Sequence, residues 1–298
     1  MAHARYGDKV RKAVITVAGM GSRFLLATKA SRKEMMAVVD KPLIKYAVEK
    51  AIDAGITEMI FITGRTKRSI ADHFNKAYQL EHQLELQDKT DLLAIAQNNV
   101  PKGVSCAYIC QTEPLGLGHA AVTATHLIGD EPFAVILADD LISSKNGASS
   151  QMVGTYEQYN SAVIAVQKVE GTSFSAYDVI SGAKQRDHID QLNSIVEKPV
   201  YADSHSDLGV TGRYIVTPKF FGRLAALKPS AGTEYQMTGA IQALLAEEQV
   251  LAYEYEGMDY GCSSKLGLLK ANIELWLQHH EISDKLCSYF KNELLVNI

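Results

Sequence analysis

The chain has 298 residues, of which 47% are hydrophobic and 21% charged, so it can bury the core of one large domain or of a domain with appendages. Its net charge of -4 and pI of about 6.1 argue against nucleic acid as the main partner, because binding a phosphate backbone needs a strongly basic face. Four cysteines without zinc or disulfide spacing indicate a reduced, cytoplasmic protein, and the absence of a long apolar run argues against a membrane partner.

The beginning of the chain contains the most informative segment. Residues 1–10 are too polar for a signal peptide and are expected to form a flexible tail. The apolar run 13–17 then predicts a strand, which ends in a turn that contains Gly19 and Gly21. Backbone N–H groups of such a turn can approach an anion closely, and nearby cations offset the charge of a polyphosphate. The segment therefore indicates a nucleoside triphosphate site, with cations at Arg23, Lys29 and Lys33.

Two other glycine motifs do not match this turn. The dinucleotide fingerprint requires a third glycine, whose place Phe24 occupies, and an acidic residue near the end of the second strand. The second predicted strand, 58–63, leads instead into a basic run over 64–68. A P-loop is disfavoured because no Gly-Lys-Ser/Thr follows the turn. A nicotinamide oxidoreductase is therefore disfavoured too, while an ordinary glycine turn stays open on local grounds.

Strand-like and helix-like segments alternate through the next part of the chain. This alternation favours parallel strands with helices on both faces, and we predict an α/β fold. A helix is expected after Pro42, with an apolar stripe toward the core, and another over 67–93, which is rich in charge and Gln. Further strands are predicted at 106–111, 133–138 and 162–166.

The pattern changes after residue 176. Two short apolar runs between 176 and 199 predict an antiparallel ribbon attached to the main sheet, and 209–217 predicts one more strand. The segment 263–298 is expected to be helical, with apolar stripes that either pack on the body or pair subunits.

Two clusters follow predicted strands, where an open α/β sheet places its ligands. Gln111 precedes a glycine loop over 114–119, and its amide could read the edge of a base. Asp139 and Asp140 end another strand, and magnesium commonly takes one or two carboxylates plus substrate phosphates. An ordinary glycine turn and a helix-capping Asp pair are the alternatives.

Two more clusters contain groups suited to a sugar phosphate. Glu197 could bind sugar hydroxyls and Lys198 a phosphate, although the two could equally form a surface ion pair. The segment 234–238 precedes a predicted helix and could merely cap it.

Taken together and in this order, the clusters resemble the bacterial-type UTP:glucose-1-phosphate uridylyltransferases of the sugar-1-phosphate nucleotidyltransferase family. The resemblance runs from Lys12 to about His279, and its specificity lies in the order of the motifs. It implies a Rossmann-like three-layer nucleotidyltransferase fold with a mostly parallel central sheet, and a catalytic domain over 11–262. The matching segments are 19–23, 27–30, 33–35, 39–44, 114–119, 196–199, 212–214 and 265–267.

The resemblance also implies substrates, a cofactor and roles for single residues. UTP and glucose 1-phosphate would give UDP-glucose and pyrophosphate, with Mg²⁺ as cofactor, in a homodimer or homotetramer. Arg23, Lys33 and Lys198 would be catalytic, and Asp139 would hold the metal. The nucleotide would contact Ala18, Gly19, Gly21, Ser22, Glu34, Gln111 and Gly116, and the sugar Asp178, Glu197, Thr211 and Glu234.

The chain departs from the family at several of these places. The family's second metal carboxylate is replaced by Gly261, and Asp259 is expected to lie several ångströms from the missing acid on the same strand face. Asp178 replaces a sugar-site glycine, and Gly239 replaces an acid. Prolines near the first loop are replaced as well, which would loosen it, at Leu26, Arg32 and Ala37.

These departures leave two hypotheses from different classes. The chain is an active uridylyltransferase, or it is a catalytically weakened paralogue that binds nucleotide and regulates an active homologue. The presence of the main polar site residues favours the enzyme.

Overall fold

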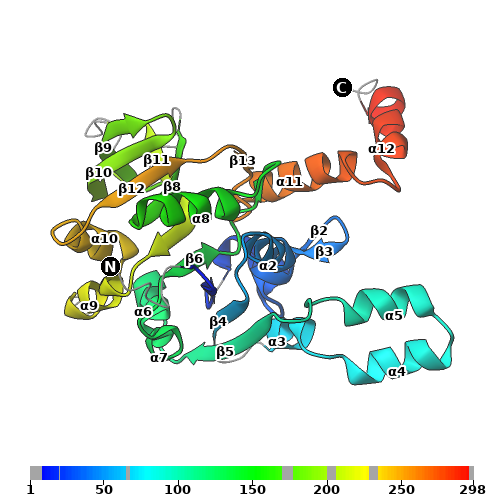
Figure 1. Cartoon of the computed structure of the whole chain (residues 1–298). Coiled ribbons are helices and arrows are strands. Elements are labelled where there is room, and N and C mark those ends of the chain that lie inside the picture. The colour runs from blue at the N-terminus through cyan, green and yellow to red at the C-terminus, as the bar shows by residue number, and fades with distance from the viewer. Residues whose placement is uncertain are drawn as a thin grey trace.

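A single large sheet forms the centre of the protein. The computed structural model describes residues 9–19, 21–64, 68–169, 177–199, 206–227 and 234–294. Within them, nine strands pair in the order β5-β4-β1-β6-β11-β8-β12-β10-β9, and β11 and β10 run antiparallel to their neighbours (Figure 1). The predicted mostly parallel α/β sheet is thus confirmed. Its strands are β1 (Lys12–Val17), β4 (Glu58–Gly64), β5 (Ser105–Gln111), β6 (Phe133–Leu137), β8 (Ala162–Lys168), β9 (Val179–Arg186), β10 (Ile189–Val196), β11 (Leu208–Val216) and β12 (Val250–Glu254).

Helices cover both faces of the sheet. Successive side chains of a strand point to opposite faces, so on β1 Val14 packs into one core and Ile15 into the other. Helices α6, α9 and α10 contribute to the first core, and α2, α3 and α8 to the second. This is the three-layer arrangement that the resemblance implies. The covering helices are α2 (Leu43–Asp53), α3 (Ser69–Phe74), α6 (Gly116–Thr123), α7 (Thr125–Ile128), α8 (Ala148–Tyr159), α9 (Lys219–Ala226) and α10 (Met237–Leu244).

Two small antiparallel ribbons lie outside the main sheet. One pairs β2 (Ala37–Val38) with β3 (Lys41–Pro42). The other pairs β7 (Ile142–Ser143) with β13 (Met258–Asp259), and so brings the segment after β6 against the segment before the C-terminal helices. The first loop itself contains two 3₁₀ turns and one short helix, η1 (Ser22–Phe24), η2 (Lys33–Met35) and α1 (Leu25–Thr28).

The predicted strands and the ribbon over 176–199 agree with the structure to within a few residues, but the helix expected over 67–93 does not. Its described part belongs to α3, α4 (Tyr78–Leu86) and α5 (Thr90–Gln97). An extended Asn75 ends α3, and Asp88, with a φ of 53°, separates α4 from α5. Helices α4 and α5 project away from the sheet (Figure 1) and bury few side chains, so tertiary packing does not hold them as one helix.

The C-terminal segment is helical, as predicted, within the described residues. It consists of α11 (Lys265–Leu277), α12 (Ser283–Tyr289) and the π-helical turn η5 (Phe290–Leu294). Leu266 and Leu269 on α11 are 62% and 56% exposed. Of the predicted N-terminal tail, residues 1–8 lie outside the described part, whereas Val10 is buried. No described helix combines the length and the apolar character needed to cross a membrane.

Gly267 lets α11 approach the loop that contains Gly261. A Cβ at Gly267 would lie 2.0 Å from the carbonyl oxygen of Tyr260 and 2.3 Å from that of Gly261. Both are backbone atoms, so Gly267→Ala should lower the free energy of unfolding by about 1–3 kcal/mol. The control is Gly154→Ala in α8, where an added Cβ meets nothing within 4 Å and alanine favours the helix. Urea unfolding of both variants measures this, and an equal effect of the two substitutions would contradict the packing described.

Candidate active site

A cavity of about 750 Å³ lies where β1 and β6 end. Acidic, basic and glycine residues from distant parts of the chain line it together. In an open α/β sheet, ligands bind just beyond the carboxyl ends of the strands, which is where this cavity lies. Of the residues singled out from the sequence, the cavity wall includes Gly19, Gly21, Ser22, Arg23, Lys33, Asp139, Asp178, Glu197, Lys198, Thr211 and Glu234.

Four further residues assigned to the site from the sequence lie beside the cavity or beneath it, whereas Lys29, expected among its cations, is exposed and is not part of the wall. Ala18 directly follows β1, and Glu34 is buried next to Lys33. Gln111 ends β5, where its Nε2 lies 3.2 Å from the carbonyl oxygen of Gly116 and 2.9 Å from His119 Nδ1. Gly116, at the start of α6, has a φ of 94°, and a Cβ there would lie 2.7 Å from Cβ of Glu234. The glycine loop therefore packs directly against one wall residue of the cavity.

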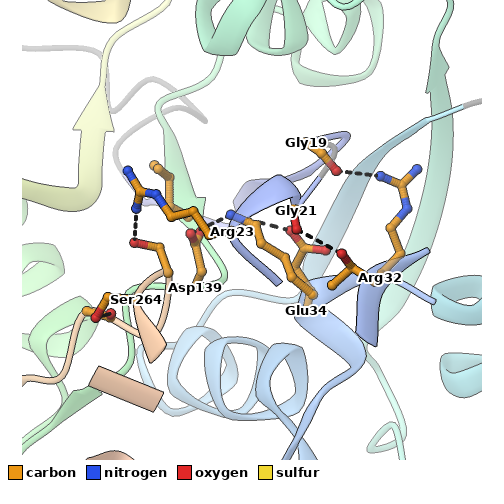
Figure 2. A network of polar contacts seen from close by, with 12 residues as sticks. Gly19, Gly21, Arg23, Arg32, Glu34, Asp139 and Ser264 are labelled. Atoms are coloured by element: carbon orange, nitrogen blue, oxygen red, sulfur yellow. Dashed lines mark hydrogen bonds and ion pairs between the residues drawn. The ribbon is translucent and has the colours of Figure 1, made fainter. Parts of the chain in front are cut away.

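The first loop is fastened by side chains in place of the prolines. Thr28 Oγ1 donates a hydrogen bond to the carbonyl oxygen of Gly21 at 2.8 Å, and Arg32 Nη1 donates one to that of Gly19 at 3.1 Å (Figure 2). Arg32 is buried, and a Cβ on Gly64 would lie 2.5 Å from its Nη2. The expected loosening at this position is thus offset, because the arginine connects the loop to the next strand.

Lys33 and Asp139 form the central ion pair of the cavity. Lys33 Nζ lies 2.5 Å from Asp139 Oδ2 and 3.9 Å from Glu34 Oε1 (Figure 2). Burial lowers the pKa of Lys33, but the charge and hydrogen bond of Asp139 and the charges of Glu34 and Asp140 together outweigh burial, so the pKa is raised overall. The ammonium group is therefore held in its charged form beside the carboxylate.

Two further carboxylates lie close to Asp139. Burial raises the pKa of Asp140 to about 7, and the charges of Asp139 and Asp259 add to this effect. Burial also raises the pKa of Asp259, and the charge of Asp139 acts in the same direction. Buried Arg213 crosses behind them and donates to the carbonyl oxygens of Leu137 and Asp140 at 2.6 and 2.7 Å. The guanidinium thus holds the turn that carries the acids.

Two carboxyl groups, a lysine and a threonine line another part of the cavity wall. Glu197 and Lys198 follow β10, with 4.0 Å between Oε1 and Nζ, and Lys198 has a φ of 37°, an uncommon value for a residue other than glycine. Burial raises the pKa of Asp178, and the charge of Glu197 raises it further. Thr211 on β11 is buried, and its Oγ1 donates to the carbonyl oxygen of Ala165 at 3.4 Å.

Several wall residues were not assigned from the sequence. Ser263 accepts a hydrogen bond from Arg23 Nη1 at 2.8 Å, and so connects the first loop to the segment before α11 (Figure 2). Tyr235 donates its N–H to the carbonyl oxygen of Leu115 at 2.8 Å, which joins segment 234–238 to the glycine loop. Neither contact has a local sequence signal, because each partner lies more than a hundred residues away. Arg213 lies in segment 212–214, which matches the family pattern, but its burial follows from the pairing of β11 within the sheet and could not be predicted from the sequence.

The cavity has donors for a divalent cation but no complete cage. Among the described residues, no group of three or more His, Cys, Asp or Glu side chains has metal-binding geometry. Carboxylate oxygens of Asp139 and its neighbours are nevertheless the hard ligands that magnesium takes when substrate phosphates supply the others. The donor set therefore fits a metal that arrives with a nucleotide.

Glu34 should make stability depend on pH. Burial raises its pKa to about 7, so between pH 4.5 and 7 the folded protein keeps a proton that the unfolded chain has released. The free energy of unfolding therefore falls as pH rises through this window, by on the order of 3 kcal/mol. Glu34→Gln cannot titrate, and its unfolding free energy should fall less between pH 5 and 8 than that of the wild type.

Urea unfolding at several pH values measures the difference. Glu281→Gln at an exposed position serves as the control, with an expected change within about 0.5 kcal/mol. Identical pH slopes for the wild type and Glu34→Gln would contradict the burial argument.

Comparison with known proteins identifies the family. The family model for nucleotidyl transferases matches residues 12–275. A UTP–glucose-1-phosphate uridylyltransferase of Bacillus subtilis (strain 168), YngB, is 42% identical over 284 residues, which are 95% of each chain. A UTP–glucose-1-phosphate uridylyltransferase of Pseudomonas aeruginosa is 44% identical over 264 residues, 88% of this chain and 94% of the relative.

Solved structures of such enzymes share the fold. The UTP-bound UGPase from Acinetobacter baumannii has a TM-score of 0.89 and 36% identity, covering 95% of this chain and 99% of that one. A UDP-glucose pyrophosphorylase complexed with UDP-glucose has a TM-score of 0.82 and 38% identity, covering 91% of this chain and 100% of that one. The chain therefore belongs to the nucleotidyl transferase family and, within it, to the group of UTP–glucose-1-phosphate uridylyltransferases.

Proposed function

We propose that the protein transfers the uridylyl group of UTP to glucose 1-phosphate and releases pyrophosphate, with UDP-glucose as the product. One observation carries this reaction beyond family membership. A single cavity joins the first loop, with Arg23 and Lys33, to the Glu197–Lys198 pair at its other end, and Asp139 lies in the same wall. Two phosphorylated substrates can therefore meet in one space.

The nucleotide occupies the half of the cavity next to the first loop. The backbone of Ala18 and Gly19 and the Gln111–Gly116 pair contact the base, while Gly21, Ser22 and Glu34 line or support the phosphate path. The hydrogen bond between Gln111 and Gly116 supports this assignment, because it fixes the amide beside the glycine loop. Arg32 supports it too by orienting the carbonyl oxygen of Gly19.

The sugar phosphate occupies the other half. Glu197 and Glu234 accept hydrogen bonds from sugar hydroxyls, Thr211 and Asp178 close the wall, and Lys198 binds the phosphate. Asp178 replaces a glycine of the family pattern, and its raised pKa means that its charge is disfavoured next to Glu197. A carboxyl group that gains a proton more easily repels a phosphate less.

Catalysis then consists of positioning and charge stabilisation. A phosphate oxygen of glucose 1-phosphate attacks the α-phosphorus of UTP, the bond to the β-phosphate oxygen breaks, and pyrophosphate leaves with the electron pair. Arg23 and Lys33 stabilise the negative charge that develops on the leaving phosphates. Lys198 holds the attacking phosphate, so both charged substrates are placed without a covalent intermediate.

We infer that Mg²⁺ accompanies the nucleotide and is bound by Asp139. When bound, it neutralises phosphate charge as a Lewis acid. In the structure Lys33 neutralises Asp139, so a cation at this carboxylate leaves the ammonium group free to pair with the leaving phosphates. The two cations, Mg²⁺ and the Lys33 ammonium group, would thus serve one carboxylate and one pyrophosphate.

The protein is proposed to act as a homodimer or homotetramer through the helical segment 263–298. The exposed leucines of α11, Leu266 and Leu269, support a contact between copies. The weakened-paralogue hypothesis gains no support from the comparisons, and the cavity retains Arg23, Lys33, Lys198 and the carboxylates of Asp139 and Glu197.

A coupled assay of pyrophosphate release tests the function directly. With Mg²⁺ and glucose 1-phosphate, we expect turnover with UTP that exceeds turnover with dTTP, ATP and GTP. Turnover should stop when Mg²⁺ is chelated and resume when it is restored. Stabilisation of the protein by UTP without any pyrophosphate release would favour the weakened paralogue, and stabilisation by NADH alone would contradict the assignment.

Asp139→Asn should separate catalysis from folding. The substitution removes the carboxylate that balances Lys33 and supplies the metal ligand, so we expect kcat to fall by about 10²-fold or more with the fold retained. Asp130→Asn is the matched control, since Asp130 is exposed and lies outside the cavity wall. Steady-state kinetics and melting temperature should be measured together, and unchanged kcat in Asp139→Asn would rule out the metal role.

A further inference from the structure

Gly261 leaves space in the cavity wall where the family pattern has an acid. Its φ is 53°, and a Cβ built on it would meet no heavy atom within 4 Å. A side chain at this position would therefore project into the cavity that Asp139 also lines. The structure thus contains the room for a second metal carboxylate without the residue that usually supplies it.

The Asp259 carboxylate lies next to the backbone of Gly261. Its Oδ1 accepts a hydrogen bond from the backbone N–H of Gly261 at 2.9 Å, so the side chain folds back onto that peptide group, on a different side from the open Cβ position. Asp259 also lines the cavity. The carboxylate nevertheless stays more than 4 Å from the place of a Cβ on Gly261, in keeping with the separation of several ångströms expected from the sequence.

The β7–β13 ribbon holds Asp259 beside Asp139. Asp259 pairs with Ile142, and Tyr260 donates its N–H to the carbonyl oxygen of Leu141 at 3.1 Å. Leu141 and Ile142 follow the Asp139–Asp140 turn directly, so backbone hydrogen bonds fix the distance between the two acidic segments. Binding of a cation would then require only the side chains of Asp139 and Asp259 to move.

Charge balance around these acids is incomplete. Asp139 is paired with Lys33 at 2.5 Å. Arg213, the other nearby cation, directs its hydrogen bonds to the backbone carbonyl oxygens of Leu137, Gly212 and Asp140. In the described part of the chain, neither Asp140 nor Asp259 has an ion-pair partner within 4.0 Å. Three carboxyl groups therefore lie near two cations, one of which, Lys33, also lies 3.9 Å from Glu34, and a divalent cation would offset this excess of acidic groups.

The two unpaired acids differ in what they can reach. A Cβ on Gly212 would lie 2.1 Å from Asp140 Oδ2, so this carboxylate is packed against β11 and acts within the wall. Asp259 instead binds a backbone N–H through one carboxylate oxygen, and the neighbouring cavity wall at Gly261 carries no side chain. Asp259 is thus the acid with room for a ligand.

We propose that Asp259 and Asp139 together bind the divalent cation of the nucleotide complex, with Asp259 acting from two residues upstream in place of the acid missing at Gly261. The proposal rests on the proposed function for the nucleotide that completes the shell. One or two carboxylates plus phosphate oxygens form the usual set for magnesium, and this pair supplies the protein's share. The substitution at Gly261 then relocates the second ligand.

Mn²⁺ binding measured by electron paramagnetic resonance tests the pair without relying on turnover. Free Mn²⁺ is titrated with wild type, Asp259→Asn and Asp130→Asn, each with and without saturating UTP. We expect Asp259→Asn to weaken Mn²⁺ binding by about 10-fold to 100-fold, with wild-type melting temperature, while Asp130→Asn binds as the wild type does. The double variant Asp259→Asn/Gly261→Asp should recover most of the loss, because aspartate tolerates a positive φ and its Cβ has space.

The outcomes separate this proposal from the proposed function. Equal Mn²⁺ affinity in the wild type and Asp259→Asn would overturn the pair, whatever the turnover. If Gly261→Asp did not restore the Mn²⁺ affinity lost in Asp259→Asn, the proposal would also be overturned, because an acid at position 261 would then not replace Asp259. Asp259-dependent Mn²⁺ binding without any uridylyl transfer would support the pair and contradict the proposed function.

Discussion

The balance of charge around Asp139 is the constraint on which the rest of the site depends. The carboxylate is largely buried, and leaving it unpaired there would cost several kcal/mol. Lys33 lies 2.5 Å away and carries the balancing charge in the structure. The same ammonium group is needed by the leaving phosphates during the proposed reaction. In the proposed reaction Mg²⁺ therefore replaces Lys33 as the partner of Asp139, and Lys33 pairs with the pyrophosphate instead.

The fold brings this ion pair together from two separate directions. Asp139 follows β6 and Lys33 lies in the loop after β1, and the parallel pairing of these two strands puts their ends at the same edge of the sheet. Arg213 comes from the antiparallel β11 and fastens the acidic turn by its carbonyl oxygens. Gly267 then allows α11 to close against the loop around Gly261.

The strands of the main sheet except β12, and the order of the site motifs along the chain, could be predicted from the sequence, because apolar runs and glycine turns are local signals. The division of 67–93 into three helices could not, since it depends on an extended Asn75 and a positive φ at Asp88. The significance of Asp259 could not be predicted either. It depends on a ribbon of only two residues per strand, β7–β13, and on a side chain that folds back onto the peptide group of Gly261. Arg32 illustrates the same limit, because its hydrogen-bond partner, Gly19, is known only from the folded loop.

The position of the metal in the loaded cavity tests this view of the site most directly. Crystals grown with UTP and Mn²⁺ would allow the ion to be placed by its anomalous scattering. We expect one peak within coordination distance of both Asp139 and Asp259, with Lys33 moved from Asp139 to the β- and γ-phosphates. A peak bound to Asp139 alone, with Asp259 still accepting its hydrogen bond from Gly261 and Lys33 still paired with Asp139, would contradict it.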